Sequence, residues 1–221
     1  MKDHRIQVLL FSFLLAFCSL FYELVFAQVL SVCIGGTKTQ YLITISLFTF
    51  ALGMGSLSFN RLTKNIEIKK IFFYVEFLLI ILGSLGPFFI AWLLQAKHEF
   101  SLFLNLKIYF SYFIIFLIGF LSGFELPCLF SMMDKAHGKV LAFDYLGMLL
   151  ASILFPFLFL PHLGTAASTL FIANMNGIAL IWLRKVKSRK LNLVLGGINI
   201  SIFAIIIIYR FERLRGISFK I

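Results

Sequence analysis

Charged side chains are scarce in this sequence. They make up 13% of the 221 residues, and only 9 of them are acidic, whereas 61% of the residues are hydrophobic. A soluble globular domain needs more polar surface than this to face water. Apolar runs of about 20 residues, the length of a helix that crosses a bilayer core, recur along the chain. The sequence therefore predicts an all-α fold, a polytopic bundle of transmembrane helices.

Cysteine is also rare, and none of the 3 cysteines stands in a metal-binding motif. Cys18, Cys33 and Cys128 lie inside apolar runs, where cysteine packs as a small apolar side chain. The sequence also lacks a phosphate-binding glycine loop, a serine nucleophile elbow and a paired-histidine metal motif. We therefore predict no catalytic residue, no metal ion and no cofactor.

The apolar runs predict about seven membrane spans, and a number between six and eight stays open. Their boundaries are residues 6–33, 40–59, 71–94, 108–133, 140–160, 165–183 and 191–209. Together they define a transmembrane domain over residues 1–209. Residues 210–221 form a basic amphipathic tail, of a kind that lies at the lipid headgroups. The lipid bilayer is thus the first predicted partner.

The net charge of +11 comes from basic residues that cluster between apolar runs, as in 61–70 and 184–190. Lysine and arginine beside membrane spans set orientation and meet anionic lipid. Because no basic folded domain is present, a nucleic-acid partner is not expected. The pattern predicts a membrane protein with a cytoplasmic N-terminus, and the location that we expect is a bacterial inner membrane. Seven spans would then place the basic tail outside, and a re-entrant segment would resolve that conflict.

Four acidic residues lie inside the predicted spans, namely Glu23, Glu76, Glu125 and Asp144. A carboxylate in hydrocarbon is costly, so such residues face a protein interior or a wet cavity and mark paths for ions or protons. Glu76 lies close to the basic pair at 69–70 and is interpreted as interfacial. The other three are the candidates for function.

Glu23, Glu125 and Asp144 are the predicted ligands of a bound cation. Each has an aromatic neighbour in the sequence, and a carboxylate beside an aromatic face suits an organic cation. Tyr22 and Tyr145 are predicted to share the binding site. The alternative is that these acids pair with nearby lysines and serve only the fold.

Two prolines are predicted to shape a cavity around these acids. Pro127 follows Glu125 by two residues, and Pro156 lies inside the fifth span. A proline ring bends a helix and frees carbonyl groups there. The alternative is that both are ordinary kinks of membrane helices.

Short motifs surround the acidic residues. They are Tyr22-Glu-Leu-Val-Phe-Ala-Gln-Val-Leu-Ser31 with Gly35-Gly36, Phe50-Ala-Leu-Gly-Met-Gly-Ser56, Glu125-Leu-Pro127, and a block from Asp144-Tyr-Leu-Gly147 through Phe155-Pro156 to Leu160-Pro-His-Leu-Gly164. In these motifs the sequence resembles the membrane domain of integral-membrane spermidine synthase-like proteins, the polyamine aminopropyltransferase family.

In that family the membrane spans usually precede a soluble aminopropyltransferase domain that binds decarboxylated S-adenosylmethionine. The resemblance implies a polyamine-related function. This sequence ends at Ile221, about where such a domain would begin, so we do not expect its chemistry in this chain.

The sequence predicts a multi-pass membrane module that binds or transports a cationic small molecule such as a polyamine. The rival hypothesis is a non-catalytic anchor or scaffold for a separately encoded synthase, a soluble aminopropyltransferase partner. An integral-membrane enzyme would need a clustered acid–base set that the spacing does not supply. Enzymatic activity of this chain is therefore not expected.

Overall fold

The computed structural model describes residues 2–64, 66–95, 101–133 and 137–183, and it contains no β-strand among them. The elements are α1 (Lys2–Ile34), α2 (Thr37–Leu62), α3 (Ile68–Gln95), α4 (Ser101–Ser122), α5 (Glu125–Ser131), α6 (His137–Leu154), the π-helical turn η1 (Phe155–Phe159) and α7 (Leu160–Leu183). The predicted all-α fold is confirmed for this part of the chain. The predicted seventh span and the basic tail at 210–221 lie outside the described residues.

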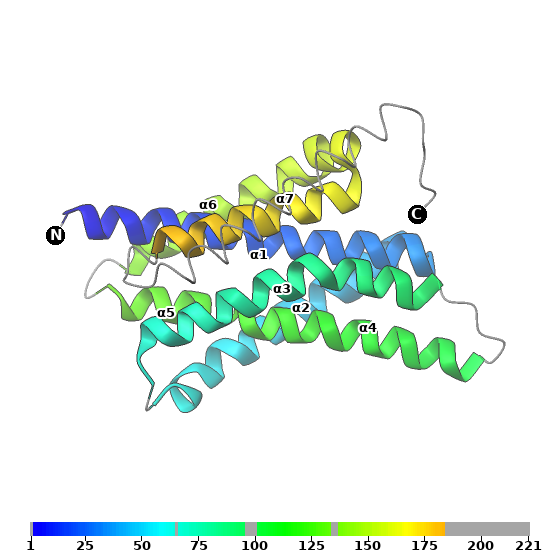
Figure 1. Cartoon of the computed structure of the whole chain (residues 1–221), viewed down its shortest axis with the longest axis horizontal. Coiled ribbons are helices and arrows are strands. Elements are labelled where there is room, and N and C mark those ends of the chain that lie inside the picture. Colours follow the sequence, from blue (N-terminus) through cyan, green and yellow to red (C-terminus); the bar gives the residue numbers. More distant parts are fainter. Residues whose placement is uncertain (1, 65, 96–100, 134–136, 184–221) are drawn as a thin grey trace.

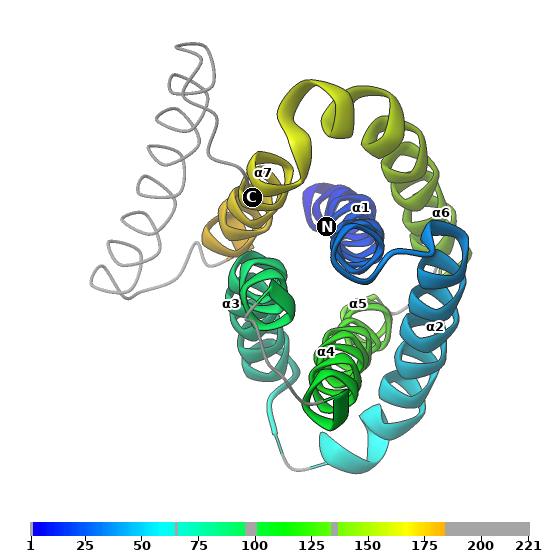
Figure 2. The same cartoon turned by 90° about the vertical axis from the view of Figure 1, so that its right-hand side faces the viewer.

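Helix α1 is the centre of the bundle. Viewed end-on in Figure 2, it lies inside a ring of the other helices, and it contacts every other α-helix. Its sequence is apolar on all sides, so it has no polar face to turn outward. Phe21, Val25, Phe26 and Leu30 are accordingly inaccessible to solvent. The middle of α1 therefore faces all the helices that could form a common site.

Glycines allow two pairs of helices to approach closely. On α4, Gly119 and Gly123 lie against the backbone of α2, and Gly55 of α2 lies against the backbone of α4. On α6, Gly147 lies against the carbonyl group of Phe13 in α1. A side chain at any of these positions would overlap the neighbouring backbone. These contacts therefore fix how the helices pack.

Among the described residues, the number of candidate spans differs from the prediction. Five segments of this part of the chain are long and apolar enough to cross a membrane: Arg5–Ile34, Thr37–Leu62, Ile68–Gln95, Asn105–Ser131 and His137–Ile178. The first four correspond to the first four predicted spans. The fifth is 42 residues long and joins the predicted fifth and sixth spans. Helical turns continue through η1 and past residue 160, where the sequence indicated the end of the fifth span, and the chain direction changes only at Gly164.

This long segment nevertheless folds back on itself at Gly164. The residue has a φ of 73° and a ψ of 176°, a non-helical conformation that essentially only glycine adopts. As a result, α6 and α7 lie on opposite sides of α1 (Figures 1 and 2). The turn therefore brings α7 back beside α1 and α3, which α7 contacts.

A Gly164→Ala substitution is expected to lower the free energy of unfolding by about 1–3 kcal/mol, because alanine is strained at this φ and ψ. No atom lies within 4 Å of the added methyl group, so only backbone strain contributes. Thermal unfolding of the purified protein in detergent measures the effect. Gly53→Ala is the matched control, since Gly53 also has open space around it but lies inside α2 without a positive φ. An equal loss of stability in both variants would contradict the explanation by backbone strain at residue 164.

Candidate functional site

Glu125 stands at a break between two helices. Helix α4 ends at Ser122 and α5 begins at Glu125, with Pro127 as the third residue of α5. Proline has no backbone N–H, and its ring conflicts with the carbonyl group four residues earlier, at Gly123. The chain therefore turns at Gly123 and Phe124 before helical bonding resumes. Glu125 itself is buried, with 7% of its surface exposed.

Asp144 comes from α6, which runs parallel to α1 at this point. The Ser12 hydroxyl of α1 donates a 2.8 Å hydrogen bond to the Val140 carbonyl, and Gly147 lies against Phe13. Asp144 lies between these two contacts along α6 and is buried, with 8% of its surface exposed. Its carboxylate interacts electrostatically with Glu125.

Glu76 of α3 completes this group. Its side chain is 1% exposed, and neither carboxylate oxygen has a hydrogen-bond partner. It interacts electrostatically with Glu125, and both lie within electrostatic range of Cys18 in α1. We call Glu76, Glu125 and Asp144 the acid cluster. It joins one carboxylate from each of α3, α5 and α6 beside the middle of α1.

The interpretation of Glu76 as interfacial was wrong. Because Glu76 is close to the basic pair at 69–70 in the sequence, it was expected to contact the lipid headgroups. In the structure it lies on the buried face of α3. The buried residues Phe72, Val75, Leu79 and Gly83 surround Glu76 at helical spacing. A count of apolar positions at three- and four-residue intervals would have placed Glu76 on the inward face.

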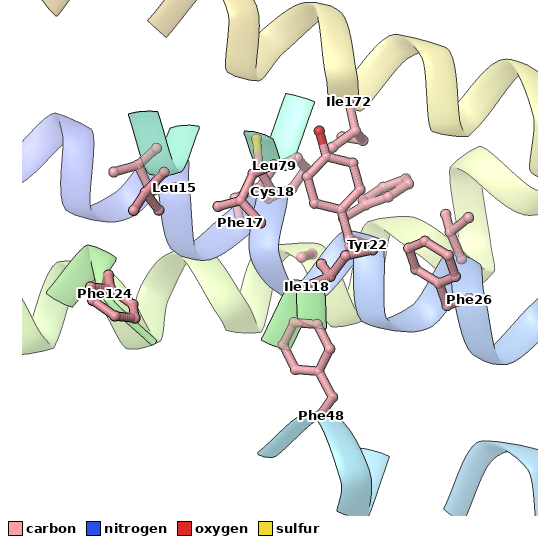
Figure 3. Close-up of a cluster of buried hydrophobic side chains, with 14 of the residues drawn as sticks. Leu15, Phe17, Cys18, Tyr22, Phe26, Phe48, Leu79, Ile118, Phe124 and Ile172 are labelled. Atoms are coloured by element: carbon pink, nitrogen blue, oxygen red, sulfur yellow. The ribbon is translucent and has the colours of Figure 1, made fainter. Parts of the chain in front are cut away.

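Tyr22 of α1, a residue of the predicted binding site, lies near Glu76 of the acid cluster. Its ring packs against Gly83 of α3, where an added Cβ would come within 2.5 Å of the ring atoms Cε1 and Cζ. Figure 3 shows the Tyr22 hydroxyl directed away from the backbone of α1, on the side of Ile172 in α7. The side chain is 1% exposed, and its hydroxyl has no hydrogen-bond partner.

Asn176 of α7 also lies at this site, although it was not among the predicted site residues. It is 2% exposed and lies within interaction range of both Glu76 and the Tyr22 hydroxyl. No hydrogen bond of acceptable geometry joins the three groups, since their oxygen atoms have no partner. Its position depends on the turn at Gly164, which brings α7 beside α3.

Glu23 is buried but stands apart from the acid cluster. It is 5% exposed and follows Tyr22 directly in α1. Successive residues of an α-helix point about 100° apart, so Glu23 cannot share the direction of Tyr22. Among the described residues, no other acid interacts with the Glu23 carboxyl group, whereas Glu125 interacts with two other acids.

Tyr145 and Pro156 do not lie with the acids. Tyr145 is 60% exposed, because it follows the inward-facing Asp144 and points to the outer surface of α6. Pro156 is exposed as well, at the second position of η1. Of the two prolines, only Pro127 is therefore close to a member of the acid cluster.

No basic side chain neutralises the acid cluster among the described residues. A salt bridge does occur in the described part of the chain, between Lys70 and Glu67 at 3.4 Å, but both partners are on the surface. Within the same ranges no group of three or more His, Cys, Asp or Glu side chains is arranged to hold a metal ion. The cluster is thus an interior set of three carboxyl groups without a basic partner among the described residues.

The chain is similar to several curated bacterial proteins. It is 27% identical over 199 residues to the polyamine aminopropyltransferase of Oceanobacillus iheyensis, an alignment that covers 85% of this chain and 38% of that protein. It is 32% identical over 183 residues to the polyamine aminopropyltransferase of Leptospira interrogans, covering 79% and 35% respectively. The chain resembles part of the polyamine aminopropyltransferases.

A similar match links the chain to polyamine aminopropyltransferase 1 of Streptomyces coelicolor, with 29% identity over 188 residues. The chain spans about a third of the length of these curated relatives. No family model matches the sequence, and no solved structure matches it. The resemblance therefore concerns one part of a protein named for a polyamine reaction.

Proposed function

We propose that this chain is a multi-pass membrane module that binds or transports a cationic small molecule, a polyamine, through its acid cluster. One observation carries the proposal: buried Glu125 lies within electrostatic range of two other buried carboxyl groups, Glu76 and Asp144, and none of the three forms an ion pair among the described residues. The names of the relatives support a polyamine as the cation. Spermidine, which carries several ammonium groups, has the charge to match several carboxylates.

Electrostatics favours a bound cation at this site. Removing a carboxylate from water costs several kcal/mol, and a nearby like charge adds repulsion. A cation among the three acids offsets both costs, because each carboxylate gains a charge-assisted hydrogen bond. The cluster therefore favours a cationic ligand.

The outer surface supports placement in a membrane. Large apolar side chains point outward from several helices, among them Leu57 at 82%, Phe157 at 77% and Trp92 at 67% exposure. Apolar exposure on this scale suits contact with lipid. We propose that the bilayer surrounds the bundle, as in a bacterial inner membrane.

The charges at the two ends of the bundle support a cytoplasmic N-terminus. Arg5, Arg61 and Lys139 lie at the end where α1 begins, whereas Lys38 begins α2 at the opposite end (Figure 1). Basic residues favour the cytoplasmic side of a membrane. The described part of the chain thus supports the orientation that the sequence predicted.

The second candidate is an anchor or scaffold for a soluble aminopropyltransferase. It is supported by the names of the relatives, together with the fact that the chain matches only about a third of their length. Under this alternative the acid cluster would serve packing alone. An aminopropyltransferase that co-purifies with the chain, without any spermidine binding, would favour it.

The test is the binding and flux of labelled spermidine with the purified chain in proteoliposomes. We expect saturable binding by the unaltered chain, and about 10-fold weaker binding by Asp144→Asn, because a charged hydrogen bond is lost. Thermal unfolding shows whether the variant is folded. Absence of binding in the folded, unaltered chain would overturn the proposal, and binding that is equal in both would remove Asp144 from the site.

A further inference from the structure

Five buried oxygen atoms in or next to the acid cluster have no hydrogen-bond partner, and one of them is the Ser122 hydroxyl near Glu125. The other four are the Tyr22 hydroxyl oxygen, Oε1 and Oε2 of Glu76, and Oδ1 of Asn176. The three side chains are only 1–2% exposed, so bulk water does not satisfy them. Native proteins rarely leave buried polar atoms unpaired, since each costs about 1–3 kcal/mol. Several such atoms in one place indicate a site whose ligand is a hydrogen-bond donor.

The three side chains come from three different helices and lie near one another. Glu76 on α3 interacts electrostatically with Tyr22 on α1, and Asn176 on α7 lies within interaction range of both. Gly83 leaves space for the Tyr22 ring and fixes it against α3. The hydroxyl is thereby held on the side of α7 (Figure 3). The oxygen atoms are therefore preorganised by backbone packing.

The chemistry of these oxygen atoms selects the ligand. A carboxylate accepts hydrogen bonds but donates none, and Oδ1 of asparagine is also an acceptor. A primary ammonium group carries one positive charge and three N–H donors, so it can satisfy several of these oxygens at once. A quaternary ammonium group has the same charge but no N–H, and it would leave every one of them unpaired.

We propose that Tyr22, Glu76 and Asn176 form a subsite for one N–H-bearing ammonium group, and that this subsite selects amines by their N–H donors. The inference rests on the proposed function and names the chemistry by which the site recognises its cation. Glu125 interacts with both Glu76 and Asp144, so a second ammonium group of the same linear amine would lie at Glu125 and Asp144. The ligand class is therefore a linear diamine or polyamine.

The decisive experiment compares two dications of equal charge on the unaltered chain. The probes are 1,4-diaminobutane and the same compound with six N-methyl groups, each competing with labelled spermidine for the purified chain in nanodiscs. We expect the methylated compound to compete about 100-fold more weakly, since a buried polar site rejects an analogue that cannot hydrogen-bond to it. Equal competition by the two compounds would overturn the subsite.

Two variants test the residues. Glu76→Gln is expected to weaken diamine binding about 10- to 100-fold through loss of a charged hydrogen bond, and Tyr22→Phe about 5-fold through loss of a neutral one. Tyr22→Phe should also reduce the difference in how strongly 1,4-diaminobutane and its methylated analogue compete with labelled spermidine. The matched control is Tyr112→Phe, which removes a hydroxyl bonded to Gln40 at 2.8 Å instead. It should leave diamine binding unchanged.

The outcomes separate this inference from the proposed function. If Asp144→Asn weakens binding while Glu76→Gln and Tyr22→Phe do not, the subsite is wrong and the function stands. If the folded, unaltered chain binds neither spermidine nor 1,4-diaminobutane, both are wrong, and ordered water is what the four oxygens hold. If Glu76→Gln does not fold, the two-probe comparison and Tyr22→Phe decide the question.

Discussion

Replacing Gly147 with leucine is expected to separate α6 from α1 and to lower the free energy of unfolding by about 3 kcal/mol. Even a Cβ at this position would overlap the carbonyl oxygen of Phe13 and approach the Phe17 backbone nitrogen to 3.1 Å. Backbone atoms of two packed helices cannot move aside as the end of a flexible side chain can. The loss should appear in thermal unfolding in detergent and as a reduced yield of monodisperse protein.

Gly138→Leu provides the matched control for this prediction. Gly138 lies in the same helix, is exposed, and has no atom within 4 Å of an added Cβ. Leucine has a higher helix propensity than glycine, so the control should be as stable as the unaltered chain or more stable. If both variants unfold at the same temperature, the close approach of α1 and α6 does not determine stability.

A Glu125→Gln substitution is expected to weaken spermidine binding about 100-fold, more than any other single change in the acid cluster. Glu125 is the member that interacts with both of the others, so its loss would affect the ammonium group bound at Glu125 and Asp144 and also the neighbouring one at Glu76. Equilibrium binding of labelled spermidine measures the loss. In the Glu125→Gln, Asp144→Asn double variant, the fold-loss of spermidine affinity should be smaller than the product of the two single fold-losses, because both residues bind the same ligand.

Glu23→Gln is the control for this experiment. It makes the same chemical change at a residue of similar burial, 5% exposed against 7% for Glu125. Glu23 points away from Tyr22 and is not part of the acid cluster, so its replacement should alter spermidine affinity less than about 2-fold. A large loss at Glu23, or none at Glu125, would show that the acids act in a different arrangement from the one proposed.

Some members of the site were accessible from sequence. Glu125 and Asp144 stood out because a carboxylate within an apolar run demands an interior partner. Tyr22 was chosen as the neighbour of Glu23, and it proved to lie beside Glu76 and Asn176 instead. Sequence adjacency was a poor guide, since neighbouring residues on a helix face different directions. For the same reason Tyr145, which follows Asp144, is on the outer surface.

The helical fold and the approximate limits of the first four apolar segments follow from the sequence itself. Hydrophobic runs of this length specify helices because every backbone polar group must be bonded within its own segment in an apolar medium. The break before Glu125 was also readable, since proline cannot continue the hydrogen bonding of a helix. These are local properties, and local chemistry determines them.

Only the tertiary structure decided which acids meet. Glu76, Glu125 and Asp144 come from three helices, and Asn176 comes near Glu76 because the chain reverses at Gly164 and returns along α1. Such proximity depends on the rotation of each helix about its axis and on which helices touch. Glycines take part in setting both: Gly147 brings the backbones of α6 and α1 together, and Gly83 makes room on α3 for the Tyr22 ring. These contacts join residues far apart in the sequence. The sequence supplied the charged groups, and helix packing made them one site.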